Sequence, residues 1–380
     1  MNDTKEPKVA FVCDFLTKFG GAQQVLLAMH ETFPDAPIYC LLYDEKGTLG
    51  KFKKAKIIPS RLQNSILSSR PKYLLPKFAA AVEEFDLSKF DIVISSSDSF
   101  AHGAITKPST FHLCYCHTPM RYAWDWNQEY LVENHLGFGI KGLIVRKIIH
   151  ELRLWDRAAA DRVDHWLANA ENVKKRIAKY YKAEADVLYP PIDLEGITPN
   201  NQPPLDSYLI VSRIEPYKKI RLAVEAFNES GKELIIIGEG SQKEELEDIA
   251  KDNIKFLGSK YGNELYPYFQ QAKAFLFPGE DDFGITPVES MAAGRPVVAF
   301  KKGGTLETVI EGQTGVFFDR ETSASLNSAI VHLEENFEDF TPAKCRKQAE
   351  NFSKELFQEK LKKEALEGYK QYKSTLDIYK

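Results

Sequence analysis

The sequence predicts an α/β protein made of two doubly wound domains that face each other across a central cleft. Apolar runs of strand length alternate with helix-period patterns through both halves of the 380-residue chain. Such alternation is typical of parallel sheets covered by helices on both faces. The alternation stops once, in a Pro- and Asn-rich segment at 198–204, and then starts again. A chain of this length accommodates two or three domains.

In the first half, short apolar runs predict strands, and apolar residues recurring at helical spacing predict helices. The predicted strands are 9–13, 38–43, 91–96 and 111–116, with a further strand and helix near 166–181. Gly20-Gly21 leads into an amphipathic helix, and Ile144, Ile148, Leu152 and Trp155 mark another. Residues 1–195 are assigned to this N-terminal domain.

The second half repeats the pattern in residues 196–354, which are assigned to the C-terminal domain. The predicted strands are 208–212, 234–237, 254–257 and 274–277, and the predicted helices are 218–228, 243–250 and 265–272. The tail 353–380 is charged and helical. Doubly wound sheets bind ligands outside the carboxyl ends of their strands, so residues that follow strands are the candidates for a site.

Composition indicates an ordinary globular protein, with 43% hydrophobic and 27% charged residues. No apolar run reaches the ~20 residues that span a bilayer, and the first residues lack the apolar core of a signal peptide. We therefore predict a cytoplasmic protein. The five cysteines, an odd number lying mostly in apolar runs, predict reduced packing residues. A metal site at Cys114, Cys116 and His117 is less favoured, because no second ligand pair completes it.

Positive charge is concentrated in residues 51–80, which hold eight basic residues and no acidic one although the net charge of the chain is -4. The eight are Lys51, Lys53, Lys54, Lys56, Arg61, Arg70, Lys72 and Lys77. A solvated basic face explains them, and so does contact with an anionic lipid surface or a phosphorylated acceptor. Nucleic acid is not expected, because the rest of the chain is not basic and no motif for it occurs.

The most informative segment is 280–294, which follows the predicted strand 274–277 and turns through Gly284 into a helix. Free N–H groups at a helix N-terminus bind phosphate, and Glu289 in the first turn would grip sugar hydroxyls. A structural alternative is a capping box with Thr286 at the N-cap, Pro287 next and Glu289 third. The strand, glycine turn and small residues around the segment favour a nucleotide-sugar site.

A second candidate lies at 211–219, where Arg213 ends a strand and Lys218 and Lys219 open the next helix. Cations at a helix N-terminus oppose its dipole, so a bound anion would favour the arrangement. A diphosphate fits Arg213 and Lys218. The alternative is a solvated basic turn paired with Glu215.

Other residues carry weaker signals. His117 follows the strand 111–116, which would place it at a cleft edge, where a structural and a functional role are equally supported. Gly20-Gly21 lacks the spacing of a dinucleotide fold, and Gly238 fits an ordinary turn. The acidic run Glu280-Asp281-Asp282 is either a metal-binding or a solvated loop. No metal is expected, because Arg213 and Lys218 already neutralise a diphosphate.

Together these residues resemble the retaining GT-B glycosyltransferases of the large group-one family, family four of the usual classification. The resemblance covers nearly the whole chain. Its specific parts are Gly20-Gly21-Ala22-Gln23, His117 through Tyr122, Arg213 with Lys218, and Phe283 through Glu289. Residues 114–125 are similar to a bacterial subgroup of mannosyltransferases that build surface polysaccharides.

The resemblance implies a role for each matching residue. Glu289 would accept the ribose hydroxyls of the donor, and the backbone of Gly284, Ile285 and Thr286 would face its sugar and diphosphate. Arg213 and Lys218 would stabilise the leaving diphosphate, and His117 would contact the transferred sugar. The remaining donor-side residues are Gly20, Gly21, Gly238, Glu280 and Phe283, and the acceptor-side residues are Arg121, Tyr122 and Trp124. The C-terminal helix, from about 355, would pack back on the N-terminal, acceptor-side domain.

One position departs from the family pattern. The family places a glutamate eight residues before Glu289, where this chain has Asp281. Asp281 is one methylene shorter, and the neighbouring Glu280 could substitute for it.

The predicted function is metal-independent, retaining transfer of a hexose. The predicted donor is GDP-mannose, and the acceptor is a glycan or lipid-linked saccharide of a surface polysaccharide. No cofactor is expected, and residues 51–80 would hold the protein at the inner face of the plasma membrane. The alternatives are a nucleotide-sugar epimerase or hydrolase on the same fold, and a non-catalytic membrane-docked assembly protein.

Overall fold

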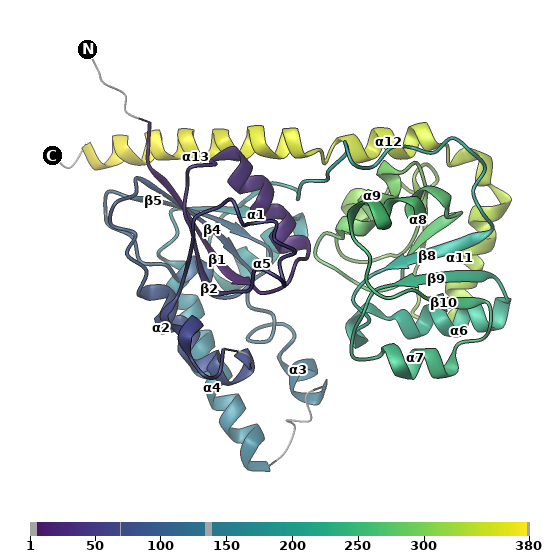
Figure 1. Cartoon of the computed structure of the whole chain (residues 1–380), viewed down its shortest axis with the longest axis horizontal. Helices are drawn as coiled ribbons and strands as arrows, with labels where there is room; N and C mark the ends of the chain where they lie inside the picture. The colour runs from purple at the N-terminus through teal and green to yellow at the C-terminus, as the bar shows by residue number, and fades with distance from the viewer. Residues whose placement is uncertain (1–5, 69, 134–138, 378–380) are drawn as a thin grey trace. The chain divides into compact units, whose positions relative to one another are not determined.

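The computed structural model describes residues 6–68, 70–133 and 139–377, and the chain divides into two units (Figure 1). One unit holds the chain up to Tyr189 together with the chain from Gln358 onward, and the other is Pro190–Phe357. The division falls at 189/190 instead of 195/196 because the intervening segment is bonded into the second unit. Ile192 forms a bridge with Ser353, and the Arg346 guanidinium donates to the Leu194 carbonyl at 3.2 Å.

The N-terminal unit contains a parallel sheet in the order β3-β2-β1-β4-β5-β6-β7. Its strands are β1 (Val9–Leu16), β2 (Ile38–Tyr43), β3 (Ile57–Pro59), β4 (Ile92–Ser97), β5 (Phe111–Cys116), β6 (His165–Ala168) and β7 (Asp186–Val187). The winding reverses between β1 and β4, which is where doubly wound sheets open a ligand crevice. Strand β1 ends three residues later than the predicted strand 9–13, so Asp14 lies within the sheet.

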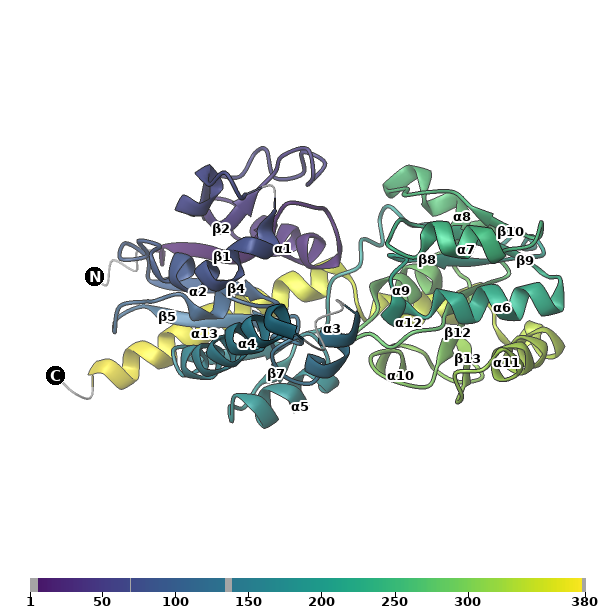
Figure 2. The ribbon, with the colours of Figure 1, turned by 90° about the horizontal axis from the view of Figure 1, so that it is seen from below.

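Helices cover both faces of this sheet. They are α1 (Gly21–Thr32), α2 (Leu75–Glu83), α3 (Asn127–Glu133), α4 (Gly139–Ala160), α5 (Glu171–Tyr180) and α13 (Lys354–Asp377), with short 3-10 turns η1 (Arg61–Asn64), η2 (Pro71–Leu74) and η3 (Ala101–Gly103). Helix α13 runs along the sheet in both views (Figures 1 and 2). It is held there because Gly368 lies against the Phe111 ring and the Tyr372 hydroxyl donates to the Pro108 carbonyl at 2.8 Å.

The C-terminal unit contains a second parallel sheet in the order β10-β9-β8-β11-β12-β13. Its strands are β8 (Ser207–Val211), β9 (Glu233–Ile237), β10 (Ile254–Phe256), β11 (Ala274–Phe277), β12 (Val297–Phe300) and β13 (Gly315–Phe318). Its helices are α6 (Ile220–Ser230), α7 (Lys243–Ile249), α8 (Tyr266–Gln271), α9 (Ile285–Ala292), α10 (Thr305–Thr308), α11 (Ser323–Glu335) and α12 (Pro342–Glu350), with 3-10 turns η4 (Pro216–Lys218), η5 (Gly262–Glu264) and η6 (Phe337–Asp339). The winding again reverses, here between β8 and β11.

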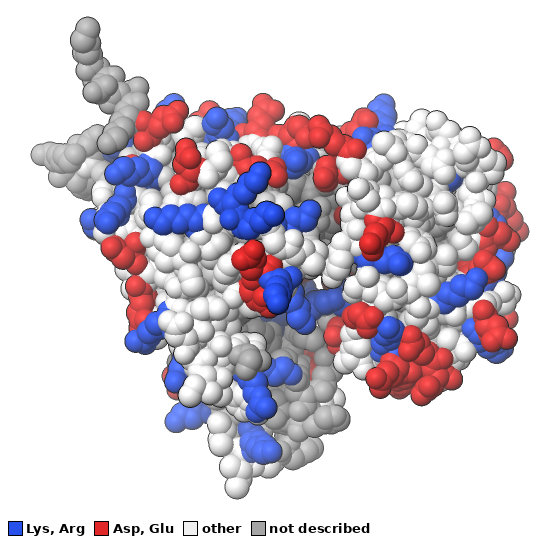
Figure 3. Space-filling model, in the orientation of Figure 1, with Lys and Arg blue, Asp and Glu red and all other residues white. Residues whose placement is uncertain are grey.

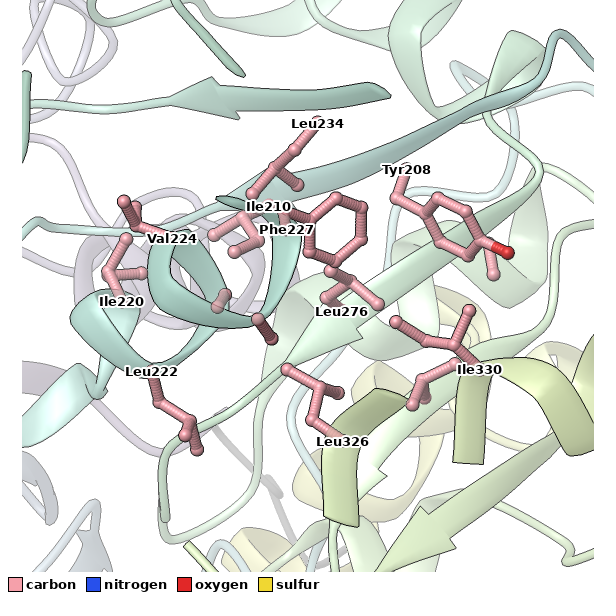
Figure 4. Close-up of a cluster of buried hydrophobic side chains, with 14 of the residues drawn as sticks. Tyr208, Ile210, Ile220, Leu222, Val224, Phe227, Leu234, Leu276, Leu326 and Ile330 are labelled. Carbon is pink, nitrogen blue, oxygen red and sulfur yellow. The ribbon is translucent and has the colours of Figure 1, made fainter. Parts of the chain in front are cut away.

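The core of the C-terminal unit lies between this sheet and helices α6 and α11 (Figure 4). Tyr208 and Leu276 from the strands pack against Phe227 of α6 and Ile330 of α11, and all four are at most 1% exposed. Each strand of a parallel sheet is covered on both faces, which explains why the strands read as continuous apolar runs. The fold thus brings the ends of β8 and β11 together on a rigid base.

The five cysteines are free and buried. Cys114 and Cys116 belong to a cluster with Trp166, Ala168 and Val173, so their packing role is confirmed. Within the described parts of the chain, no helix is both long and apolar enough to pass through a membrane.

Candidate functional site

The predicted donor-site residues of the C-terminal unit gather where the winding of its sheet reverses. Arg213 and Lys218 follow β8, and Glu280, Asp281 and Gly284 follow β11. Strands β8 and β11 are direct neighbours, with Tyr208 opposite Ala274. The crevice beyond such a pair is the preferred ligand site of doubly wound sheets.

Lys218 and Asp281 form the central ion pair of this region. The Lys218 Nζ donates to Asp281 Oδ2, and the two side chains are only 13% and 25% exposed. The ammonium also lies 5.2 Å from the Tyr217 ring centroid and 5.8 Å from that of Phe277, which favours the cation. The sequence predicts Lys218 as the start of a helix, but it ends the 3-10 turn η4, and α6 begins only at Ile220. Lys219 between them adopts a left-handed conformation, with φ of 55°.

Arg213 lies beside this pair without being neutralised by Glu215. Its guanidinium donates to the Tyr217 hydroxyl. Glu215 instead accepts a hydrogen bond from the Ser241 hydroxyl at 2.6 Å. The alternative of a basic turn paired with Glu215 is therefore wrong for this structure, and Arg213 stays available to an anion.

The N-terminus of α9 begins at Ile285, with Gly284 as the N-cap residue at φ 83° and ψ 86°. The predicted capping box with Thr286 at the N-cap is wrong. Thr286 is the second helical residue, no side chain caps the helix, and Glu289 lies in the second turn instead of the first. Capping therefore does not explain Glu289. The left-handed Gly284 turn places the start of the helix at Ile285, and the first N–H groups of α9 have no side-chain cap.

Glu289 faces a polar neighbourhood that the sequence alone does not reveal. Burial, together with the nearby charges of Glu289 and Asp193, raises the pKa of Tyr266 to about 12. A Cβ on Gly196 would lie 3.1 Å from the Tyr266 hydroxyl oxygen, closer than van der Waals contact, so the glycine lets Tyr266 pack against the backbone there. A carboxylate and a phenol thus come close together, a pairing suited to hydroxyl groups of a ligand.

Two glycine-rich loops complete this edge of the sheet. At Gly238 a Cβ would lie 1.8 Å from the Ser212 carbonyl oxygen, so glycine lets the β9 loop touch the Arg213 loop. At Gly304 a Cβ would lie 2.3 Å from Phe283 Cα, and the Gly304 N–H donates to the Asp281 carbonyl at 2.9 Å. Sequence reasoning missed Gly303-Gly304. The signal was present, since a glycine pair follows the buried strand 297–300 after only two residues, Lys301 and Lys302.

Phe283 and Glu280 differ sharply in exposure. Phe283 is 3% exposed, and its ring lies 5.5 Å from that of Phe352, so its side chain anchors the loop and only its backbone can reach a ligand. Glu280 is exposed. The ion pair with Lys218 is formed by the neighbouring Asp281.

The N-terminal unit has its own small pocket at the reversal between β1 and β4. Residues of β1 and α1 line it together with Ser96, Asp98 and His117. His117 Nε2 lies 2.8 Å from Ser96 Oγ. Burial lowers the pKa of His117 to about 4, while the charge of Asp98 acts in the opposite direction. The imidazole is thus neutral at pH 7 and acts as a hydrogen-bonding group.

Asp14 fixes this pocket and was missed by sequence reasoning. It is 4% exposed and accepts four backbone N–H groups, from Asp98 at 2.7 Å, Ser99 at 3.0 Å, Phe100 at 2.6 Å and Ala101 at 2.8 Å. A carboxylate inside an apolar strand run is the sequence signal for it. By holding the backbone after β4, it places Asp98 beside His117.

Gly20 and Gly21 lie at the start of α1. Gly20 is the N-cap in an extended conformation, with φ −159°, and a Cβ there would meet only Gln23 Oε1 at 3.4 Å. Neither a side-chain cap nor an acidic residue occupies this N-terminus. The helix start can therefore receive an anion, but Gly20 itself is not required by its backbone angles.

The predicted acceptor residues are held differently from one another. The Trp124 indole donates to Asp156 Oδ2 at 2.7 Å and stacks on Tyr180 at 4.9 Å, which makes it a structural anchor. Tyr122 packs against Tyr130 at 5.7 Å. The Arg121 guanidinium lies 5.7 Å from the Trp126 ring, and its Nε is buried with no hydrogen-bond partner among the described residues. Of the three, Arg121 is the one that a further ligand would complete.

Metal-ligating side chains come together at one place in the described part of the chain. His165 Nε2 lies 3.5 Å from Asp186 Oδ2 and 3.4 Å from Glu364 Oε2, linking β6, β7 and α13. The carboxylates are 67% and 37% exposed, so a pairing between a histidine and two carboxylates explains the group.

Comparison with known proteins gives the family of the second unit. Residues 200–352 match the family described as glycosyl transferases group 1. The alpha-1,3/1,6-mannosyltransferase ALG2 of Dictyostelium discoideum is 28% identical over 229 residues, covering 46% of this chain and 53% of the relative. A GDP-mannose-dependent alpha-mannosyltransferase of Mycolicibacterium smegmatis is 27% identical over 195 residues, covering 47% and 51%. The chain thus spans about half the length of the curated relatives it matches.

Similarity to a solved structure extends over nearly the whole chain. The structure of Anabaena Alr3699/HepE in complex with UDP has a TM-score of 0.68 and 17% identity, and the match covers 94% of this chain and 98% of that one. At this identity the likeness shows the fold alone. It confirms the predicted GT-B class with two Rossmann-like units.

Proposed function

Residues 200–352 belong to the group 1 glycosyltransferases, and from that premise we propose a retaining mannosyltransferase. Its donor is GDP-mannose and its acceptor is a glycan or lipid-linked saccharide used in surface polysaccharide synthesis. Glycosyl transfer is supported by the family that residues 200–352 match, and it is part of our proposal. The donor, the stereochemistry and the acceptor are our proposal.

The observation that carries the proposal is the set of positive groups at the β8–β11 reversal. Lys218, Arg213 and the N-terminus of α9 all lie beyond the same pair of strand ends. Two cations and a helix N-terminus together match the charge of a diphosphate. Glu289, beside Tyr266, would accept the ribose hydroxyls.

In the proposed reaction, the bond between the anomeric carbon and the β-phosphate oxygen breaks, and the acceptor hydroxyl forms a new bond on the same face. The acceptor proton passes to the departing phosphate oxygen, so no base residue and no covalent enzyme intermediate is needed. Lys218 and Arg213 stabilise the negative charge that grows on the leaving group, which is where preorganised charge accelerates a reaction most. We propose that these two cations, although Lys218 also pairs with Asp281, offset enough of the diphosphate charge for the transfer to need no metal.

His117 and Asp281 are assigned supporting roles. The neutral imidazole of His117 would hydrogen-bond the transferred sugar, and its contact with Ser96 would fix its orientation. Asp281 would hold Lys218 in position, and exposed Glu280 would contact the sugar hydroxyls. This division accounts for the aspartate at the position where the family has glutamate.

The mannose assignment is supported by the two relatives named as mannosyltransferases, one of them named as GDP-mannose-dependent. A UDP-hexose is the second candidate donor, because the structural neighbour was crystallised with UDP. A panel of GDP, UDP and ADP in thermal-shift assays, followed by turnover of the matching nucleotide sugars, separates them. Stabilisation by UDP and not by GDP would overturn the mannose assignment.

The same experiment tests the other classes of function. An epimerase or hydrolase would consume donor without any acceptor, whereas a non-catalytic assembly protein would bind no nucleotide. We also propose attachment to the cytoplasmic face of an anionic membrane through residues 51–80. All eight basic residues of that segment are exposed, and basic side chains are spread over the N-terminal unit (Figure 3).

A further inference from the structure

The solvent-facing side of α4 is apolar where a soluble helix would be polar. Ile140, Leu143 and Ile144 are 77%, 69% and 55% exposed, and their spacing places them on one face of the helix. Exposed apolar residues are normally scattered singly over a surface. Three within five residues form a patch that calls for a partner.

A different face of α4, in the turns that follow, is apolar as well and is covered by the protein. Val145, Ile148 and Ile149 pack into the core of the N-terminal unit together with residues of α2. A helix on the surface of a soluble protein normally has one apolar face, which packs on the core, and a polar face on the solvent side. Here one side is covered by the protein, and the other is left for a second apolar environment. In Figure 1 the first turns of α4 extend beyond the sheet of their unit.

The charge around the patch indicates what covers it. Residues 139–150 contain Lys141, Arg146 and Lys147 and no acidic residue. The neighbouring segment η2–α2, which packs with α4, adds the exposed Lys72 and Lys77. Lys72, Lys77 and Lys147 form no ion pair with any residue that the structure describes. Their charges are therefore free to meet anionic groups of a partner.

Tyr73 lies between Lys72 and Lys77 in the sequence, and it is 67% exposed. Aromatic residues with a polar tip favour the boundary between lipid and water. Apolar side chains that enter the acyl region, with lysines and a tyrosine at headgroup level, describe a helix that lies in a membrane interface. A second copy of this chain fits less well, because a symmetric contact would bring the same cations face to face.

We propose that Ile140, Leu143 and Ile144 of α4 insert into an anionic lipid bilayer, with Lys72, Lys77, Lys141 and Lys147 on its phosphates. The inference deepens the proposed function and rests on it only through the acceptor, since a bilayer would present a lipid-linked saccharide to the enzyme. The α4 patch adds apolar side chains that can enter the acyl region, which the charges of the basic segment 51–80 cannot do.

The test is co-sedimentation of the full-length protein with vesicles of phosphatidylcholine alone or mixed with phosphatidylglycerol. The variant Ile140→Gln/Leu143→Gln/Ile144→Gln should lower partitioning into the mixed vesicles by at least about tenfold. The matched control Leu205→Gln/Ile249→Gln/Val331→Gln changes exposed apolar residues of the other unit and should partition like the wild type. Lys141→Gln/Lys147→Gln should lose about fivefold per lysine at low salt and little at high salt.

Any of three results would overturn the inference. The first is no partitioning of the wild type into the mixed vesicles, and the second is partitioning of the α4 triple variant as strong as that of the wild type. The third result is a wild-type dimer that the triple substitution abolishes, with no vesicle binding by either protein. Melting temperatures verify that the variants are folded. Nucleotide stabilisation is measured on the same samples. Vesicle binding without any nucleotide effect would refute the proposed function and leave the lipid surface standing.

Discussion

Replacing Lys218 by alanine should reduce turnover by about three decades while the fold stays intact. A unit charge ~4 Å from a phosphate oxygen contributes about 4 kcal/mol at an effective dielectric constant of about 20. Each 1.36 kcal/mol is about one decade in rate. Lys218 is 13% exposed, so water replaces its charge poorly. The variant also leaves the 25% exposed Asp281 without its cation, and the bare carboxylate would repel the diphosphate.

Two further variants separate these effects. Lys218→Ala/Asp281→Asn removes both charges and should restore part of the nucleotide affinity but little of the turnover, because the stabilising cation is still missing. Lys218→Arg keeps the charge with a different geometry and should fall between wild type and alanine. The assay is kcat and KM with the nucleotide sugar identified by thermal shift, together with Kd for the nucleotide. Near-normal kcat in Lys218→Ala would refute the assigned role.

Five other variants, in four predictions, test separate parts of the structure. Glu289→Ala should weaken nucleotide binding by about 10- to 100-fold through lost hydrogen bonds to a charged group, and unchanged calorimetric affinity would contradict its ribose role. His117→Ala should lower kcat. The wild-type kcat should show no break near pH 6.5, because burial lowers the pKa of His117 to about 4 and keeps the imidazole neutral. A break near pH 6.5 that the variant abolishes would speak against a neutral imidazole. Gly304→Ala should destabilise the C-terminal unit by about 1–3 kcal/mol, because its Cβ would clash with the Phe283 backbone. Gly20→Ala, which meets no such clash, should melt like the wild type, and equal melting temperatures for the two variants would disprove this steric argument. Burial raises the pKa of the Asp156 carboxyl from 3.8 to about 7. The contribution of Asp156 to the free energy of unfolding is therefore fully present below the unfolded pKa and is lost as the pH rises through about 7. Between acid and mildly alkaline pH, Asp156→Asn should gain about 4 kcal/mol of unfolding free energy relative to the wild type, and a pH-independent difference in urea unfolding would rule this out.

The candidate site was only partly predictable. The sequence indicated Lys218, Arg213 and Glu289, because residues that follow apolar runs lie at the ligand-binding ends of parallel strands. Sequence reasoning passed over Asp14 and Gly304 in spite of their place in or after apolar runs, because their importance comes from contacts with backbone atoms far away in the chain. Asp14 contacts residues 98–101 across the sheet, and Gly304 touches Phe283.

The capping box shows why a local pattern was misleading. Thr286, Pro287 and Glu289 have the spacing of a helix start, but Gly284 adopts a left-handed conformation and the helix begins at Ile285. The loops around it, packed on the Gly303-Gly304 turn, set that start. Local propensity is a weak guide where tertiary contacts decide the backbone angles.

The sequence by itself determined the two doubly wound units, because the period of apolar residues decides which segments become buried strands and which become covering helices. Only the tertiary structure decided the order of the strands, the partner of Lys218, the neutral state of His117 and the open apolar face of α4. The physical reason is that these depend on burial and on contacts between residues distant in the chain. Periodicity describes neighbours along the chain, and it does not describe neighbours in space.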